Sequence, residues 1–344
     1  METSFLAYVR GRLRNLDTRQ KLPTESIKIG IGDDAAVIGC DGSLGDQIVC
    51  TDQIVDGVDF RLSDIVNASD ITNASNASAF TDPTLADIGY KAVAINASDV
   101  AAMGGHPTAM LVTLMLPTDG RDGHQGHGGL NATELAAGVY EGILEIAAER
   151  SIDIIGGDIT TCHGPMAVSV TMLGRLPIDK SSRSVGAWTR GGADVDQTLY
   201  VTGPLGGSIL GRHFRPADRR DMVDQLRRQA TVTAAIDISD GFSLDLDRLL
   251  AASGVGVLFD RDAIPVHADA HTLADRDGVD AFRHAWSDGE DFELIVAIKE
   301  SRRGEVGQRI DGLTDIGVTT SRRGLWAYQG NQLLRHSPQG YVHG

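Results

Sequence analysis

The stretch Asp87-Ile-Gly-Tyr-Lys-Ala-Val-Ala-Ile-Asn-Ala-Ser-Asp-Val-Ala-Ala-Met-Gly-Gly105 predicts one long, buried helix. Its apolar side chains recur at helical spacing, and the two glycines at its end are typical of a helix C-terminus. One acid, Asp99, stands inside this apolar and small-residue run. A carboxylate buried there must be paired, protonated or bound to a metal, because a lone buried charge is too costly. The alternative is an exposed cap at a helix break, and the stretch by itself does not decide between the two.

Length and cysteine content narrow the class of protein. At 344 residues the chain exceeds one ordinary core, so we predict two domains, with a boundary in the polar stretch 177–184. No run reaches the roughly 18 apolar residues of a membrane span. The N-terminus lacks the basic start and apolar core of a signal peptide. The three cysteines have no metal-binding spacing. We therefore expect a cytoplasmic protein with reduced thiols and no membrane partner.

The net charge indicates the conditions under which the chain stays soluble. It is −16 at pH 7, with 47 acidic against 31 basic residues, and Lys occurs only at positions 21, 28, 91, 180 and 299. An acidic surface poor in lysine is typical of a halophilic protein, which stays soluble in high salt. It also argues against nucleic acid as a partner, because nucleic acid requires a basic stripe.

A glycine pattern near the N-terminus resembles a dinucleotide-binding fingerprint. Gly30-x-Gly32-x-x-Ala35 follows a predicted strand, and Asp52 stands twenty residues beyond Gly32. Two features disfavour this interpretation. The carboxylates of residues 33 and 34 would repel a pyrophosphate, and the glycines that follow at positions 39, 42 and 45 leave no room for a helix of useful length.

Hydrophobic periodicity and turn residues predict a mixture of strands and helices. Strands are expected at residues 27–31, 47–51, 108–116, 152–155, 167–173, 198–203, 255–259 and 293–298. Helices are expected at residues 4–16, 133–150, 207–213, 219–229 and 243–252. Asn131 and Thr133 are candidate N-terminal caps. The polar stretches 63–82 and 119–129 are expected to be loops.

Aspartates recur at predicted strand ends beside Gly, Ser or Thr. They are Asp33, Asp52, Asp158, Asp237 and Asp240. One such residue could be a cap, but five of them together with Asp99 favour an oxygen-only metal site, which suits Mg²⁺. The chain has no Walker loop, no HRD or DFG of protein kinases and no G-x-S-x-G. We therefore expect a metal-dependent enzyme that acts on phosphates and belongs to neither common class.

Several motifs occur together in the order of one known family. They are Gly32-Asp-Asp-Ala-Ala36, Thr51-Asp52, Asn96-Ala-Ser-Asp-Val-Ala-Ala-Met-Gly104, Gly156-Gly-Asp158, Arg190-Gly-Gly-Ala193, Asp237-Ile-Ser-Asp-Gly241 and Gly289-Glu-Asp-Phe-Glu293. Each motif is weak alone, but the combination is highly specific. The chain resembles the thiamine-monophosphate kinase family, within the superfamily of aminoimidazole ribonucleotide synthetase-like ATP enzymes.

The resemblance implies a fold, an assembly and a reaction. The fold is α/β (α+β), with an N-terminal sheet flanked by helices in residues 1–177 and a C-terminal α/β sandwich in residues 178–344. The N-terminal half would bind ATP and Mg²⁺ and pair with a second copy in a homodimer, and the C-terminal half would complete the substrate site. The reaction would be direct in-line phosphoryl transfer from ATP to thiamine monophosphate with several Mg²⁺ ions, which offset the repulsion between two polyanions.

The resemblance also assigns roles to residues. The metal ions would be held by Asp33, Cys50, Thr51, Asp52, Asp99, Asp158, Asp237 and Asp240, of which Asp33, Asp99 and Asp240 would be catalytic. Tyr140, Gly157, Arg190 and Ser239 would contact ATP, and Asp59, Glu290 and Tyr341 would contact the thiamine part.

The chain departs from the family pattern at several positions. Cys50 stands where Ser is usual, and a thiol is a poor ligand for Mg²⁺ unless the backbone carbonyl binds instead. Asp59 stands where a substrate-contacting His is usual, and the turn 158–165 is two residues longer. Two alternatives remain: a related ATP enzyme acting in aminoimidazole ribonucleotide synthesis or hydrogenase maturation, and a non-catalytic nucleotide-binding module. The second predicts decayed metal acids, yet all of them are present.

Overall fold

Two sheets organise the protein, whose computed structural model describes residues 27–40, 45–65, 83–118, 130–180 and 183–342. The helix predicted at residues 4–16, most of the loop at 63–82 and the loop at 119–129 lie outside the described residues. Within them, no helix is both long enough and apolar enough to cross a membrane.

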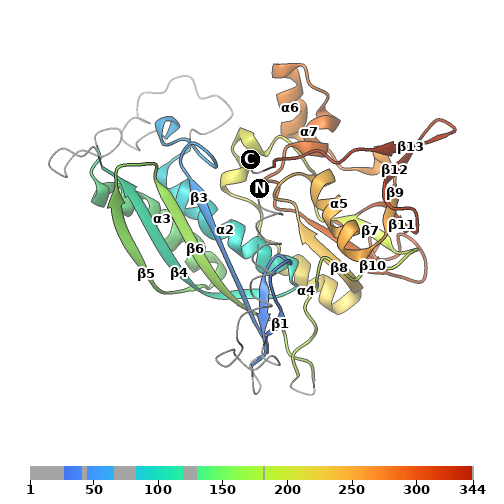
Figure 1. The fold of residues 1–344 in the computed structure, drawn as a ribbon, viewed down its shortest axis with the longest axis horizontal. Helices are drawn as coiled ribbons and strands as arrows, with labels where there is room; N and C mark the ends of the chain where they lie inside the picture. Colours follow the sequence, from blue (N-terminus) through green and yellow to red (C-terminus); the bar gives the residue numbers. More distant parts are fainter. Residues whose placement is uncertain (1–26, 41–44, 66–82, 119–129, 181–182, 343–344) are drawn as a thin grey trace, which may run out of the picture.

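The N-terminal sheet has six strands in the order β1-β2-β3-β6-β4-β5. Their bounds are β1 (Ile27–Ile29), β2 (Ala36–Ile38), β3 (Gln47–Val55), β4 (His106–Pro117), β5 (Asp153–Cys162) and β6 (Ala167–Arg175). Helices α2 (Leu85–Ala102) and α3 (Ala132–Arg150) cover one face of this sheet, as Figure 1 shows. The strand predicted as short and buried at 152–155 is instead the long edge strand β5, in which Ile155 and Ile159 are 57% and 55% exposed.

Helix α2 is the predicted buried helix, and it is confirmed. Thr84 and Asp87 form a capping box at its start, and its C-terminal glycine Gly104 adopts a φ of 72°. It packs so closely on α3 that a Cβ at Gly142 would lie 1.7 Å from the Ala86 carbonyl oxygen. Helix α3 begins after Asn131, the predicted cap.

The C-terminal sheet has seven strands in the order β13-β12-β9-β11-β7-β10-β8. The strands are β7 (Thr198–Val201), β8 (Thr231–Asp237), β9 (Gly256–Phe259), β10 (Leu294–Lys299), β11 (Thr314–Thr320), β12 (Gly324–Gln329) and β13 (Gln332–His336). The helices of this half are α4 (Arg220–Gln229), α5 (Phe242–Ser253), α6 (Ala268–Asp277) and α7 (Ala281–Ser287). Alternation along β10 explains the layers: Ile295 and Ala297 pack in the core with α5, whereas Val296 and Ile298 pack in the core with α4. The predicted α/β sandwich is therefore confirmed.

The helix predicted at 207–213 is wrong. Two short 3₁₀ turns stand there, η4 (Ser208–Leu210) and η5 (Arg212–Phe214). Gly211 joins them at a φ of 125°, a conformation that no α-helix contains.

Helix α2 lies between the two sheets (Figure 1). Its C-terminal residues Ala101 and Ala102 belong to the core that contains α4 and the C-terminal strand β10, while Val93 and Val100 belong to the core of the N-terminal sheet. A helix buried on both sides exposes no polar face, which explains its continuous apolar sequence. Polar residues on α2 are thereby brought against both halves of the chain.

Candidate active site

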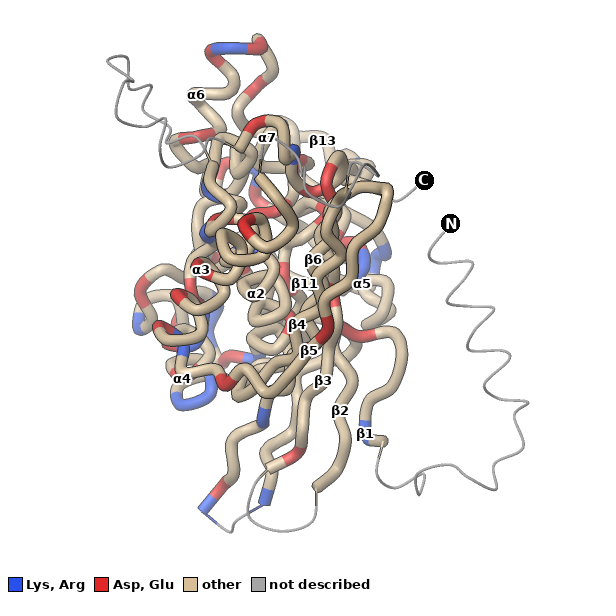
Figure 2. The backbone as a smooth tube through the Cα atoms, turned by 90° about the vertical axis from the view of Figure 1, so that its left-hand side faces the viewer, with Lys and Arg blue, Asp and Glu red and all other residues tan. Residues whose placement is uncertain are grey.

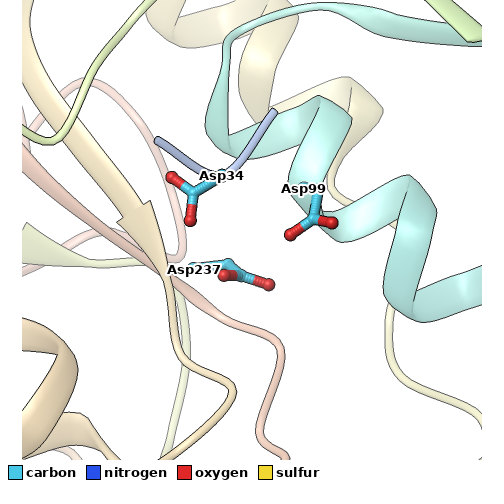
Figure 3. A group of neighbouring side chains, drawn as sticks. All are labelled: Asp34, Asp99 and Asp237. Atoms are coloured by element: carbon cyan, nitrogen blue, oxygen red, sulfur yellow. The ribbon is translucent and has the colours of Figure 1, made fainter. Parts of the chain in front are cut away.

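Three carboxylates from distant parts of the chain meet beside α2. Asp34 lies in the turn between β1 and β2, Asp99 in the last turn of α2, and Asp237 at the end of β8. One oxygen of each lies within 4.8 Å of the others, and Figure 3 shows the side chains converging. We refer to Asp34, Asp99 and Asp237 as the acid cluster.

Neighbouring groups hold the acid cluster in place. Arg190 donates from Nη2 and Nε to Oδ1 of Asp34, at 2.6 and 3.2 Å. The backbone N–H of Arg190 donates to Oδ1 of Asp33 at 2.7 Å. The Ser98 hydroxyl donates to Oδ2 of Asp237 at 2.6 Å. The two adjacent acids in the turn between β1 and β2 therefore make different contacts: Asp33 accepts a hydrogen bond from a backbone amide, whereas Asp34 belongs to the acid cluster.

The electrostatics of the acid cluster favour a bound cation. Burial raises the pKa of Asp99 well above its usual range, and the charges of Asp237 and Asp52 raise it further. Burial likewise raises the pKa of Asp237, with Asp34 adding to the effect, and it raises the pKa of Asp34 in spite of Arg190. Burial would lower the pKa of Arg190, but attraction to Asp34 raises it overall. Carboxylates placed this close are stable when a positive charge joins them.

The hydrogen bonding of Asp34 indicates whether these residues fit a metal ion. Oδ2 of Asp34 is buried and accepts no hydrogen bond from the described residues. Its side chain is only 1% exposed. An orphaned carboxylate oxygen is costly without a partner, and an all-oxygen set of ligands suits Mg²⁺. The residues therefore fit a divalent cation.

The predicted metal ligands on β3 and β5 fall on both faces of the sheet. Strand β3 continues to Val55, so Asp52 lies inside a strand and not at its end, and Asp158 lies inside β5. Cys50 and Asp52 face α2, where Asn96 Oδ1 accepts the backbone N–H of Asp52 at 3.0 Å. Thr51 faces the opposite side, where its hydroxyl lies 3.0 Å from that of Thr171. Asp158 lies on that same outward face, in register with Thr113.

The thiol of Cys50 lies near the acid cluster. Burial raises the pKa of Cys50 well above its usual range, and the charge of Asp99 raises it further. The thiol is therefore protonated at neutral pH, and it donates to the backbone carbonyl of Asn96 at 3.4 Å. This arrangement leaves no thiolate for a metal ion.

The loop after β8 contains two predicted site residues. Oδ2 of Asp245 accepts the backbone N–H groups of Ser239, Asp240 and Gly241 at 3.1, 3.0 and 3.1 Å. Arg248 donates to the carboxylate of Asp240 at 2.5 Å, so Asp240 pairs with an arginine outside the acid cluster. Burial raises the pKa of Asp245 to about 7, although Arg248 opposes this. Asp245 thus fixes the backbone that follows Asp237.

Tyr140 and Gly157, the other predicted ATP contacts, lie away from this loop. Tyr140 is partly buried on α3 and packs against the N-terminal core. Gly157 lies in β5 with a φ of 153°, and a Cβ there would lie 1.7 Å from the Val112 carbonyl oxygen. Glycine is therefore required at position 157 by the close approach of β4.

Two of the three predicted thiamine contacts, Asp59 and Glu290, meet at a buried lysine. Nζ of Lys91 donates to Oε1 of Glu290 at 2.5 Å and to the backbone carbonyl of Asp59 at 2.9 Å. The carboxylate of Asp59 accepts the backbone N–H of Val55 at 2.7 Å, so it supports its own turn. Tyr341 is 52% exposed, and its backbone N–H donates to the carbonyl of Asp240.

Sequence reasoning overlooked four residues around the site. They are Asp34, Lys91, Ser98 and Asp245. The signal for Lys91 and Ser98 is present in the sequence, because a polar side chain inside a buried helix requires a partner. Nothing in the local sequence distinguishes Asp34 from Asp33.

Comparisons with known proteins identify relatives of this chain. Residues 32–176 match the family described as AIR synthase related protein, N-terminal domain. A thiamine-monophosphate kinase of Rhodopirellula baltica is 43% identical over 353 residues, covering 100% of this chain and 98% of the relative. Another from Bacillus subtilis is 30% identical, covering 80% of this chain and 79% of the relative. The solved structure "AaThiL complexed with AMPPCP and TMP" matches with a TM-score of 0.75 at 23% identity, covering 100% of this chain and 97% of that one.

Proposed function

The chain belongs to the thiamine-monophosphate kinase family, and we propose that it transfers the γ-phosphoryl group of ATP to thiamine monophosphate, forming ADP and thiamine diphosphate. A relative solved with AMPPCP and TMP supports this pair of substrates. The observation that carries the proposal is the acid cluster, which joins the two halves of the chain beside α2. Phosphoryl transfer needs positioning and charge stabilisation more than a nucleophilic side chain, and this site supplies them.

The acid cluster would hold Mg²⁺ through the carboxylates of Asp34, Asp99 and Asp237. Bound Mg²⁺ would neutralise the phosphate oxygens as charge shifts from the transferred group to the leaving group. Arg190 holds Asp34 in place and leaves Oδ2 open. Ser98 orients Asp237 by donating to its Oδ2.

Further assignments follow from the family resemblance and are part of the proposal. Additional metal contacts would come from Asp33, Cys50, Thr51, Asp52, Asp158 and Asp240, and ATP would contact Tyr140, Gly157, Arg190 and Ser239. The thiamine part would contact Asp59, Glu290 and Tyr341. For Cys50 the contact would use the backbone carbonyl, because the thiol is buried and protonated. In this scheme residues 1–177 bind ATP and Mg²⁺, and residues 178–344 complete the substrate site.

We propose a homodimer formed through the outer face of the N-terminal sheet. Leu111 on β4 and Ile155 on β5 are 39% and 57% exposed, and no helix of the described residues covers this face (Figure 1). Strand β4 carries no Asp, Glu, Lys or Arg, as the colouring of Figure 2 shows. An obligate interface of this kind buries roughly 2,000 Å² or more, and a stable, active monomer in sedimentation would contradict it.

The proposed compartment is the cytoplasm. All three cysteines are free, which suits a reducing environment.

A discontinuous assay for thiamine diphosphate tests the proposed function. Purified protein with ATP, Mg²⁺ and thiamine monophosphate should form thiamine diphosphate and ADP in equal amounts, with thiamine and an aminoimidazole ribonucleotide precursor as control substrates. EDTA should abolish turnover, and added Mg²⁺ should restore it. A wild-type protein that turns over a control substrate and ignores thiamine monophosphate would overturn the proposal.

A matched pair of variants tests the acid cluster. Asp99→Asn should lose nearly all turnover, because it removes one of the proposed metal ligands. Its melting temperature in EDTA should stay at or above that of the wild type, because one of three closely spaced carboxylates is gone. Asp311→Asn alters an exposed aspartate outside the site and should change neither property. Near-normal turnover of Asp99→Asn would exclude the acid cluster as the reaction centre.

A further inference from the structure

Lys91 is a buried ammonium group in the middle of the structure. Its side chain is 1% exposed, while that of Glu290 is 30% exposed. Burial of an ammonium group without a partner is strongly unfavourable. Among the described residues, Glu290 is the one carboxylate that pairs with Lys91. The ring of Phe214 lies 5.6 Å from Nζ, closing a further side of the site.

The backbone of Glu290 is held in a conformation that ordinary residues avoid. Its φ is 52°, in the left-handed region. Its N–H donates to the carbonyl of Ser239 at 2.7 Å, in the loop that follows Asp237. Such a conformation is unfavourable for a residue with a side chain and persists only where the surroundings impose it. The imposed turn aims the Glu290 side chain at α2.

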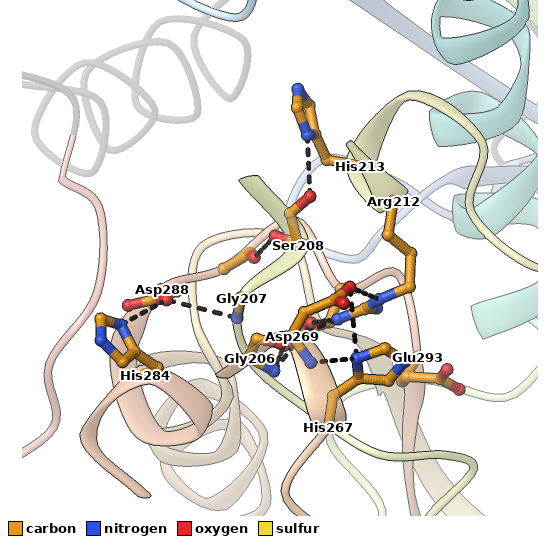
Figure 4. Close-up of polar contacts among 12 residues, drawn as sticks. Gly206, Gly207, Ser208, Arg212, His213, His267, Asp269, His284, Asp288 and Glu293 are labelled. Carbon is orange, nitrogen blue, oxygen red and sulfur yellow. Dashed lines mark hydrogen bonds and ion pairs between the residues drawn. The ribbon is translucent and has the colours of Figure 1, made fainter. Parts of the chain in front are cut away.

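The other two acids of the same motif are fixed by arginines. Arg212 donates to Oδ1 of Asp291 at 2.9 Å, and Arg219 donates to Glu293. Figure 4 shows part of this network around Arg212. The side chains of Asp291 and Glu293 are 0% and 5% exposed, so their carboxylates are occupied inside the protein. Glu290 alone of the three reaches the surface.

One oxygen of Glu290 remains open. Lys91 occupies Oε1, and Oε2 receives no hydrogen bond from the described residues. A carboxylate with one oxygen anchored and the other open is suited to a cationic or hydrogen-bond-donating ligand. Lys91 also holds the carbonyl of Asp59, the second residue expected at the thiamine part.

We propose that Lys91 is a positioning residue that orients the Glu290 carboxylate, and with it the Asp59 turn, for the cationic ring portion of the substrate. The proposal rests on the proposed function, because it names the residue that prepares the thiamine end of that site. Lys91 itself does not touch the substrate. Loss of its ammonium group frees Glu290 to rotate, which weakens binding of thiamine monophosphate and leaves ATP binding unchanged.

Steady-state kinetics of Lys91→Met test this positioning role. We expect KM for thiamine monophosphate to rise about tenfold, equivalent to roughly 1.4 kcal/mol. KM for ATP should stay within about twofold of the wild-type value, because only binding at the thiamine end of the site is affected. Lys299→Met, an exposed lysine on β10, is the matched control and should change neither constant. A general loss of folding would lower the active fraction, and with it the apparent kcat, without a selective rise in one KM, so the difference between the two KM values identifies the role.

A second variant keeps the test decisive if Lys91→Met does not fold. Lys91→Arg retains the charge, but a planar guanidinium cannot reproduce the two contacts of one ammonium group. We expect the same selective rise in KM at a smaller size, about threefold. Unchanged KM for thiamine monophosphate in the folded variants, or an equal rise in both KM values, overturns the inference while the proposed function stands.

Stability measurements provide an independent readout that needs no turnover. Glu290→Gln leaves a fully buried ammonium without its partner, whereas Lys91→Met leaves a carboxylate that is partly solvated. Glu290→Gln should therefore lower the denaturation midpoint more than Lys91→Met, and the double variant should regain part of the loss. The reverse order would contradict the pairing, and a wild type inactive on thiamine monophosphate would instead reject the proposed function.

Discussion

Replacing Arg190 by Met should destabilise the protein because it leaves Asp34 without its partner. The Asp34 side chain is 1% exposed and that of Arg190 is 28% exposed. Removal of one partner from a buried ion pair costs about 3–5 kcal/mol. Because Arg190 is partly solvated, we expect the lower end of that range, about 3 kcal/mol. The neighbouring carboxylates of Asp99 and Asp237 supply no positive charge that could replace Arg190.

A second substitution separates the unpaired charge from lost packing. In Arg190→Met/Asp34→Asn the charge is gone, so stability should return to within about 1 kcal/mol of the wild type. Arg303→Met is the matched control. Arg303 binds both oxygens of Asp315, but these side chains are 51% and 25% exposed, so its loss should cost no more than about 1 kcal/mol.

Guanidinium chloride unfolding in EDTA at fixed pH and salt measures these differences. The chelator removes any cation that would mask the unpaired carboxylate. Midpoints and slopes of the four proteins are compared, because a change of slope would report a change in the surface exposed on unfolding. The reasoning is refuted if Arg190→Met loses less than about 1 kcal/mol, or if the double variant is as unstable as the single one.

Three further predictions concern pH, packing and salt. Burial and the charge of Lys91 lower the pKa of His213 to about 4, so below about pH 6.5 the unfolded chain binds a proton at this residue that the folded chain does not bind. The free energy of unfolding should therefore fall by roughly 1–2 kcal/mol between pH 6.5 and 5. In thermal scans, His213→Gln should remove this dependence on pH. Gly142→Ala should cost about 2 kcal/mol or more in denaturant unfolding, since its Cβ meets the Ala86 carbonyl, while Gly186→Ala meets nothing within 4 Å and should be neutral. Melting temperature and activity should rise with KCl toward molar concentrations, because 47 acids repel one another against 31 bases; a steady fall would contradict this.

The pattern of apolar residues predicts those helices and strands that bury most of their side chains. Helix α2 is a long run of apolar and small residues, and strand β4 contains the continuous apolar run at 108–116, so both are found where the sequence places them. Helix α6 escapes prediction because Ala270 is its one buried residue, which leaves no apolar stripe to detect. The helix expected at 207–213 is absent because Gly207 and Gly211, at φ values of 72° and 125°, break the backbone into two short turns.

The site could be predicted only in part, because side-chain direction depends on local backbone geometry. The sequence indicated Asp99 and Asp237, and the family resemblance chose Asp33, whereas the carboxylate that joins them in the structure is that of Asp34. The turn after Gly32, at a φ of 128°, decides which of the two neighbouring carboxylates faces the cluster. The sequence also predicted that a strand ends at Asp52. The strand continues because β6 pairs with β3 as far as Val55.

The polar residues of α2 explain how one helix sets the dimensions of the site. Lys91 reaches Glu290, and Ser98, two turns later, reaches Asp237. Seven residues of helix separate these contacts by about 10 Å. Both partners belong to the C-terminal half, whereas Asn96 binds the backbone of Asp52 in the N-terminal sheet. A rigid helix tied to both halves therefore fixes the distance between the proposed thiamine end and the acid cluster, so that a shift of either half along α2 would disturb both ends together.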